Sequence, residues 1–263
     1  KLIAKGFEDF DVGQPTGMDV AQFVDQWAGQ RAAQVYLGRL SDFFRWAIRR
    51  GLRTDNPCLN IRVEKPEARR RYITDQEWHA VMDALLVGKD GRETNSGKMV
   101  QVYASLCYLL YQRTTEIRLL RWAQVDYQAG VIRFTPTKTE RSSGVSVDVP
   151  ITQEVREQLE HARKIGGVKS LYVVHTGAGK PYTAHGIGSA WRRACERAGV
   201  EDATLKDIRA KAATDAKRMG YTKKEISVGL AHTGEGMTEH YLRGRDAERS
   251  SVELRLPKNP KAG

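Results

Sequence analysis

Tyr241 lies close to the end of the chain and follows His232. A phenol is a poor nucleophile at neutral pH because its unperturbed pKa is about 10. A tyrosine that attacks phosphorus must therefore be surrounded by positive charges and hydrogen-bond donors. Earlier in the chain, Arg113, Lys138 and Arg209 can supply such charges. These residue types together predict an enzyme in which Tyr241 attacks a DNA phosphate.

The composition also favours a nucleic-acid partner. Lysine and arginine total 43 residues against 32 aspartates and glutamates, a formal net charge of +11. An excess of this size is typical of proteins that bind a polyanion, although charge alone leaves open a basic protein without such a partner. The 263 residues predict two domains, the second of them larger. Because the chain opens at Lys1 rather than methionine, we expect preceding sequence to be missing.

The cysteines and histidines do not form a pattern that binds metal. Cys58, Cys107 and Cys195 are odd in number and far apart, which argues against a disulfide framework or a zinc cluster and fits a bacterial cytoplasm. His232 and His240 have no acid or cysteine at ligand spacing, so we expect no metal and no cofactor. No apolar run approaches about 18 residues and no leader is visible, which predicts neither a membrane span nor a signal peptide.

The elements before the chemistry are predicted to form a helical domain over residues 1–60. Between residues 19 and 50, large apolar side chains recur at three- and four-residue spacing and Gly51 supplies a stop, which predicts two helices. Three arginines fall off the apolar stripe, namely Arg31, Arg45 and Arg49. Their placement suits contacts with DNA phosphates, and a solvated helix face explains it equally well.

A basic linker is predicted over residues 61–71, where Pro66 interrupts any helix. The linker residues expected to contact DNA are Arg69, Arg70 and Arg71. A second domain, residues 72–250, then begins with Thr74 and Glu77, which have the spacing of a helix capping box.

The second domain is predicted to be mainly α-helical with a small β-sheet. Helices are expected at about 98–111, 152–164, 184–198 and 205–219, a β-hairpin at 131–134 and 145–149, and a short strand at 171–174. In the tail, residues 251–263, polar and apolar side chains alternate over 251–256 as in a strand. We expect this strand to contact the catalytic domain of its own or a neighbouring subunit.

The stretch from Arg113 to Trp122, followed by Asp126, resembles the first signature of the tyrosine recombinase (phage integrase) family. An arginine at a helix start adds a bidentate donor to a place that already favours anions, and Glu116 can hold its guanidinium in position. Without the other motifs, an ordinary exposed Arg/Glu pair would explain the stretch equally well.

The stretch from Leu205 to Arg209 is similar to the second signature of this family, in which a histidine precedes an arginine by one helical turn. Lys206 occupies the histidine position here, and the spacing puts it on the same helix face as Arg209. A protonated lysine donates to phosphate but cannot accept the tyrosine proton. Two smaller departures from the family pattern are Tyr111, where glycine is common, and Ala231, where glycine often precedes the histidine.

The resemblance implies roles for three further residues. Lys138, on the β-hairpin, corresponds to the lysine that protonates the leaving 5′ oxygen. His232 is implied to donate a hydrogen bond to the phosphate, and Tyr241 to attack it. The motifs occur in the family order from Arg113 to Tyr241, and the helical module and linker before them resemble the family's core-binding domain.

A member of this family is expected to be a two-domain, C-shaped clamp that encloses double-stranded DNA. The resemblance implies a site-specific recombinase or integrase of a phage or mobile element, with four protomers on two duplexes and, in some systems, accessory DNA-bending proteins. The alternatives are a DNA-relaxing enzyme like the type IB topoisomerases, and a DNA-binding regulator that has lost cleavage, which Lys206 motivates.

Overall fold

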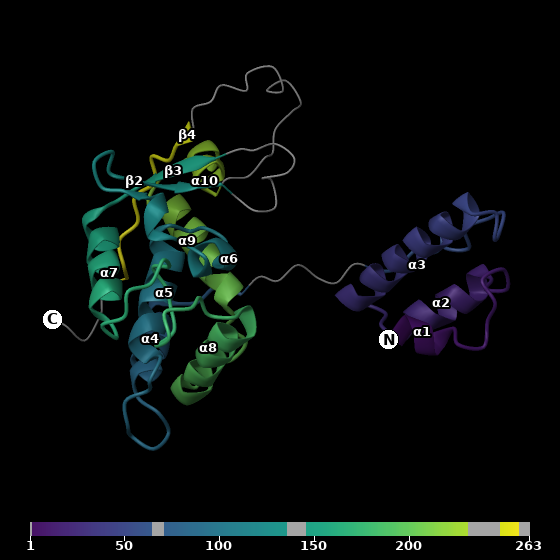
Figure 1. The fold of residues 1–263 in the computed structure, drawn as a ribbon, viewed down its shortest axis with the longest axis horizontal. Coiled ribbons are helices and arrows are strands. Elements are labelled where there is room, and N and C mark those ends of the chain that lie inside the picture. The colour runs from purple at the N-terminus through teal and green to yellow at the C-terminus, as the bar shows by residue number, and fades with distance from the viewer. Residues whose placement is uncertain (1, 65–70, 136–145, 231–247, 258–263) are drawn as a thin grey trace. The chain divides into compact units, whose positions relative to one another are not determined.

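The computed structural model describes residues 2–64, 71–135, 146–230 and 248–257. The chain forms two compact units that divide between Arg70 and Arg71, and each unit has its own hydrophobic core. Both units are rich in helices, and the second also contains a small sheet, so the predicted fold class is confirmed (Figure 1). No helix in the described ranges is both long and apolar enough to cross a membrane.

The described residues of the first unit form three helices, α1 (Leu2–Gly6), α2 (Gly17–Asp25) and α3 (Arg31–Arg49). The two helices predicted between residues 19 and 50 are therefore confirmed as α2 and α3, whereas α1 was not predicted. The apolar stripe of α3 packs on α2, and the buried side chains of this small core are Val20, Phe23, Val24, Leu40, Phe44 and Cys58. Gly51, with φ of +70°, follows the end of α3 as predicted.

The second unit contains seven α-helices, one 3₁₀ turn and four short strands among its described residues. In chain order they are α4 (Asp75–Leu86), α5 (Gly97–Leu109), α6 (Thr114–Arg118), η1 (Trp122–Gln124), β1 (Val125–Asp126), β2 (Val131–Phe134), β3 (Val147–Pro150), α7 (Gln153–Lys164), α8 (Ala184–Ala198), α9 (Leu205–Arg218), α10 (Lys223–Gly229) and β4 (Glu248–Arg249). The predicted helices correspond to α4, α5, α7, α8 and α9, and the predicted hairpin corresponds to β2 and β3.

Helix α5 is the centre of this unit. Nearly every residue of α5 is buried, and the helix contacts α4, α7, α8 and α9 (Figure 1). A helix that is apolar on all sides must be surrounded by other elements. The helix that carries Arg209 therefore packs on the same central helix as α4 and α8.

Threonine side chains or their partners fix the starts of six described helices. An N-cap threonine oxygen accepts from an otherwise unpaired backbone N–H, and an acid one turn later can return the bond. The N-cap threonines are Thr16, Thr74, Thr152, Thr183, Thr204 and Thr222. The capping box predicted at Thr74 and Glu77 is confirmed.

The four strands form one sheet in the order β1-β2-β3-β4, in which β3 and β4 are parallel and the other pairs antiparallel.

The predicted tail strand at 251–256 was wrong, because the strand is Glu248–Arg249. The pairing of β3 with β4 ends before Pro150, which has no N–H to donate, and the chain then enters α7. The predicted alternation nevertheless has a structural basis: Val252 and Leu254 are buried in the core of the second unit, so the expected contact with this domain is observed within one chain.

The predicted strand at 171–174 was also wrong. Only Tyr172 pairs, in an isolated bridge with Arg121. The partner segment turns into the 3₁₀ helix η1 at Trp122, so the ladder has no strand along which to continue.

Candidate functional site

Two arginines that are far apart in the sequence lie close together in the second unit. Arg113 directly precedes α6, and its carbonyl accepts hydrogen bonds from the N–H groups of Glu116 (2.9 Å) and Ile117 (3.2 Å). Arg209 lies in α9, close enough to Arg113 for the two charges to repel each other. The structure therefore brings together the arginines of both signatures.

This pair is held in a partly buried environment. Burial, and after it the charge of Arg113, lowers the pKa of Arg209 from 12.5 to about 10. Nη2 of Arg209 donates to the carbonyl of Leu230 (2.7 Å), and the nearby Glu116 favours the charged guanidinium. Nη1 of Arg113 is buried and has no hydrogen-bond acceptor within the described ranges. Two close cations with an available donor favour an anion between them, and phosphate matches the bidentate geometry of arginine.

Lys206 extends from the first turn of the same helix. Its side chain is exposed, and the spacing of one turn puts it on the face of α9 that carries Arg209. The first turn is fixed by Asp207, whose carboxylate accepts from the N–H of Thr204 (2.7 Å). The backbone at Lys206 is therefore fixed, and its side chain adds positive charge to the face of α9 that carries Arg209.

The opposite face of α9 carries a polar cluster that was not predicted from the sequence. Lys211 is fully buried, and its Nζ pairs with Asp215 (3.0 Å) and with Asp75. The hydroxyls of Tyr72 and Tyr108 donate to the Asp215 carboxylate at 2.6 and 3.1 Å. A lysine is rarely buried, so in the sequence this pair resembles an ordinary exposed i,i+4 ion pair. The cluster fixes α9 to α4 and α5.

Residues 71–248 match the family model described as the phage integrase family. The chain belongs to this family. It is 29% identical over 208 residues to the shufflon-specific DNA recombinase of Escherichia coli, covering 78% of this chain and 49% of that protein. It is 22% identical over 269 residues to the integrase of Escherichia phage lambda, covering 97% of this chain and 71% of that protein. The chain thus spans about half the length of the first of these relatives.

Solved structures of integrases share this fold. A lambda integrase dimer bound to a COC′ core site matches with a TM-score of 0.73 at 20% identity, over 97% of this chain and 89% of that chain. The Tn1549 transposon integrase in complex with circular intermediate DNA matches with a TM-score of 0.65 at 14% identity, over 88% and 82%. The predicted relationship to tyrosine recombinases is confirmed by the family match and by these folds.

Several residues with a predicted catalytic or DNA-binding role lie outside the described residues. They are Lys138, His232, Tyr241, Arg69 and Arg70. Their roles stay predictions, as does the C-shaped arrangement of the two units.

The remaining predicted DNA contacts differ in how far their side chains are committed to other partners. Arg31, Arg45 and Arg49 are exposed on α3; Arg45 pairs with Asp42 (3.2 Å), and Arg31 donates to Gln34. Exposed pairs of this kind contribute little to stability, so these side chains can be redirected towards phosphates. Their contact with DNA stays a prediction.

Arg71 is engaged inside the second unit. Its guanidinium donates to both carboxylate oxygens of Glu77, at 3.1 and 2.6 Å. Glu77 also accepts from the N–H of Thr74 (2.8 Å) and thereby completes the capping box. In this structure Arg71 therefore stabilises the start of α4.

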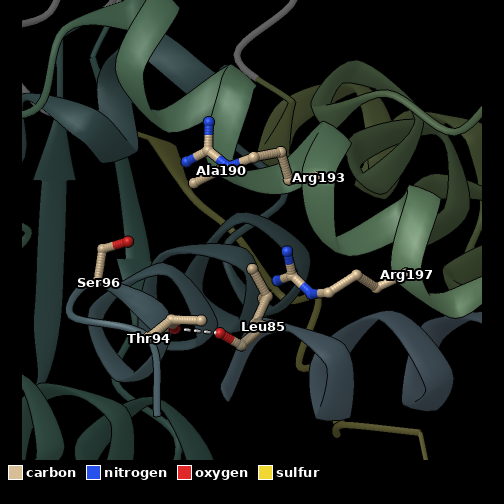
Figure 2. A pocket seen from close by; sticks show the side chains of 7 residues that line it. Leu85, Thr94, Ser96, Ala190, Arg193 and Arg197 are labelled. Carbon is tan, nitrogen blue, oxygen red and sulfur yellow. Dashed lines mark hydrogen bonds between the residues drawn. The ribbon is translucent and has the colours of Figure 1, made fainter. Parts of the chain in front are cut away.

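A small cavity lies away from the arginine pair, between the end of α4, the start of α5 and α8. Figure 2 shows its lining, to which Thr94, Ser96, Arg193 and Arg197 contribute. Arg197 donates through Nε to the carbonyl of Ala84 (3.0 Å), which joins α8 to α4. The cavity includes neither arginine of the candidate site. Among the described residues, no group of three or more His, Cys, Asp or Glu side chains is placed to hold a metal ion.

Proposed function

We propose that this chain is a site-specific DNA recombinase that cuts and rejoins DNA through a 3′-phosphotyrosine at Tyr241. The observation that carries the proposal is the pair formed by Arg113 and Arg209, which are close, partly buried and mutually repulsive. Nη1 of Arg113 also supports the proposal, because this buried donor has no acceptor among the described residues. A phosphodiester between the two guanidinium groups supplies that acceptor, and its charge increases in the pentavalent transition state that the pair would stabilise.

In the proposed first step, the oxygen of Tyr241 forms a bond to the scissile phosphorus. The bond between phosphorus and the 5′ oxygen breaks, and Lys138 supplies the proton to that leaving oxygen. The phenol gives its proton to a base other than Lys206, because a protonated lysine cannot accept a proton. His232 and Lys206 donate to the non-bridging oxygens, so the site needs neither a metal nor a nucleotide cofactor.

In the second step, the 5′ hydroxyl of a partner duplex attacks the phosphotyrosine and releases Tyr241. Bond energy is conserved because one phosphodiester replaces another. The proposed substrate is double-stranded DNA with a specific recombination site, on which four protomers join two duplexes, with accessory DNA-bending proteins where a site requires them. The proposed biological role is integration or excision of a phage or mobile element in the bacterial cytoplasm. Among the related structures, lambda integrase is a tetramer bound to a Holliday junction.

The test is covalent trapping on a nicked duplex. A nick near the scissile phosphate releases a short fragment after cleavage, so religation stops and the covalent adduct accumulates. We expect a slower-migrating adduct under denaturing conditions with the natural chain and with Tyr127→Phe, a matched control at a partly exposed tyrosine. We expect none with Tyr241→Phe, which should still bind the site. A persistent adduct in Tyr241→Phe would refute the nucleophile.

This assay, together with a plasmid assay with one or two sites, separates the alternatives. Specific binding without any adduct in the natural chain would favour a DNA-binding regulator. An adduct together with relaxation of one-site plasmids and no exchange between two sites would favour a relaxing enzyme.

A further inference from the structure

We propose that Tyr111 is a positioning residue that fixes both ends of the segment 231–247 relative to Arg113. The inference rests on the proposed function, because that segment carries His232 and Tyr241. It concerns Tyr111, Gly229 and Ser250, none of which touches the scissile phosphate in the proposed reaction.

Tyr111 has an unusual backbone and a fully buried side chain. Its φ is +36°, in the left-handed region that a residue with a large side chain seldom adopts. Its side chain is 0% exposed. Backbone strain of this kind persists only where surrounding contacts hold it. Those contacts therefore identify what Tyr111 does.

One contact is with the end of α10, directly before the segment. A Cβ added to Gly229 would lie 1.5 Å from the Tyr111 hydroxyl and 2.3 Å from Cζ, so the tyrosine ring occupies the space of a side chain at 229. Gln112 Nε2 also donates to the Gly229 carbonyl (2.5 Å), and Arg209 Nη2 donates to the carbonyl of Leu230 (2.7 Å). Neighbours of Arg113, and its partner Arg209, thus hold the point at which the segment begins.

A second contact is with Ser250, shortly after the segment. The Tyr111 hydroxyl lies 2.9 Å from Ser250 Oγ, and both groups are buried. Ser250 is fixed from other directions too, because its N–H donates to the carbonyl of Asp148 (2.9 Å) and its Oγ accepts from the N–H of Val252 (3.2 Å). One phenol therefore contacts the chain on both sides of the segment.

The chemistry explains why this matters for rate. A misplacement of about 1 Å at a reacting group can reduce a rate by about 100-fold. Burial raises the pKa of Tyr111 to about 12, so its hydroxyl stays protonated at neutral pH and keeps its bond to Ser250. The backbone that carries Arg113 and both ends of the segment that carries Tyr241 are thereby coupled through one side chain.

The test is a double-mutant cycle of Tyr111→Phe, Ser250→Ala and the double variant. Phenylalanine keeps the ring over Gly229 and removes only the hydroxyl. We expect the single-turnover rate of covalent trapping at saturating DNA to fall by about 10-fold or more in each single variant, with no further loss in the double variant. The dissociation constant for the DNA should change less than about twofold. Equal rates in Tyr111→Phe and the natural chain would overturn the inference.

A matched control is Tyr221→Phe, which removes another tyrosine hydroxyl next to the tail. That hydroxyl accepts a hydrogen bond from the N–H of Glu253 (3.4 Å). This control should retain the natural trapping rate. A merely structural role would instead lower the melting temperature and leave the rate unchanged well below that temperature.

Hydrogen exchange separates this inference from the proposed function. In the free protein, we expect the amides of Leu230 and Val252 to exchange faster in Tyr111→Phe than in the natural chain. If the natural chain forms no adduct but both amides respond, the proposed function fails and the coupling by Tyr111 stands. Unchanged exchange at both amides refutes the coupling.

Discussion

Arg209, in α9, lies beside Arg113, which directly precedes α6, although the two arginines belong to different signatures. Burial and the neighbouring charge both act against the charged form of Arg209, whose pKa falls to about 10, yet at neutral pH it remains charged. The free protein therefore tolerates an unfavourable pair of cations at one place. An anion that binds there would relieve the repulsion, so we expect the pair to bind anions whatever reaction it serves.

The first prediction is that inorganic sulfate stabilises the protein through this pair. A ligand that binds only the folded state at 100 times its dissociation constant adds about 2.7 kcal/mol. At constant ionic strength, we expect sulfate to raise the melting temperature of the natural chain more than that of Arg113→Gln. Arg192→Gln, at an exposed arginine of α8, is the control and should follow the natural chain. An equal sulfate response in Arg113→Gln would show that the effect is general salting-out.

The second prediction concerns pH and the start of α4. The hydrogen bond from Arg71, and after it the capping contacts of Thr74, hold the pKa of Glu77 below its usual 4.5 against the opposing effect of burial. A lowered folded pKa means that the stabilising contribution is present above pH 4.5 and is lost as pH falls through the folded value. Glu77→Gln should therefore melt below the natural chain at pH 7, by roughly 2–4 °C for each kcal/mol lost.

The difference in melting temperature between Glu77→Gln and the natural chain should shrink steadily below pH 4.5. Thermal melts from pH 7 to pH 3 measure it. Glu93→Gln, at an exposed pair with Lys98, serves as the control and should show little difference at any pH. A gap that stays constant down to pH 3 would contradict the assigned shift.

Helix periodicity and caps allowed much of this fold to be predicted. Long amphipathic segments such as α3, α7 and α8 have apolar side chains at helical spacing, and threonine N-caps mark their starts or those of their neighbours. The short elements α1, α10 and β4 were not predicted, because five, seven and two residues contain too little periodicity. The pairing of β4 with β3 also depends on how the chain returns, which local sequence does not determine.

The candidate site was predictable only in part. The family order of the motifs placed Arg113 and Arg209 in one site, whereas the spacing of each motif alone did not. The buried position of Lys211 could not be predicted, because its environment is assembled from Tyr72, Asp75 and Tyr108, residues distant in sequence. In the sequence, Tyr111 differs only in standing where glycine is common, and its positive φ and contact with Gly229 appear only in the folded chain.

The third prediction tests the cluster behind α9. Burial lowers the pKa of Lys211, but hydrogen bonds to Asp75, Tyr72 and Asp215 outweigh burial and raise it above 10.5. Asp215→Ala removes the more buried of the two carboxylates that pair with Lys211 and leaves it with an exposed partner, which costs about 3–5 kcal/mol.

Urea unfolding should show that loss as a lower midpoint in Asp215→Ala. The double variant Asp215→Ala with Lys211→Met should recover part of it, because the buried charge is gone. Lys217→Met, on the exposed side of the same helix, is the matched control and should be close to neutral. If the double variant is less stable than Asp215→Ala, the buried charge is not the source of the cost.

The last prediction concerns the tail, where Leu254 is 1% exposed in the core of the second unit and Arg255 is exposed. Leu254→Ala removes buried methyl groups and leaves a cavity, so we expect it to destabilise the second unit by about 2–5 kcal/mol in the absence of DNA. Arg255→Ala should be nearly neutral in the same urea titration.

Deletion of residues beyond Ser250 also removes Val252 and Leu254 and should therefore destabilise the domain itself, in addition to any effect on assembly. Assembly is better tested with Arg255→Ala and Ser251→Ala, which leave the buried residues in place. A Leu254→Ala chain as stable as the natural one would mean that the tail does not pack on its own second unit in solution, and that Leu254 reaches its buried position only in another state of the protein.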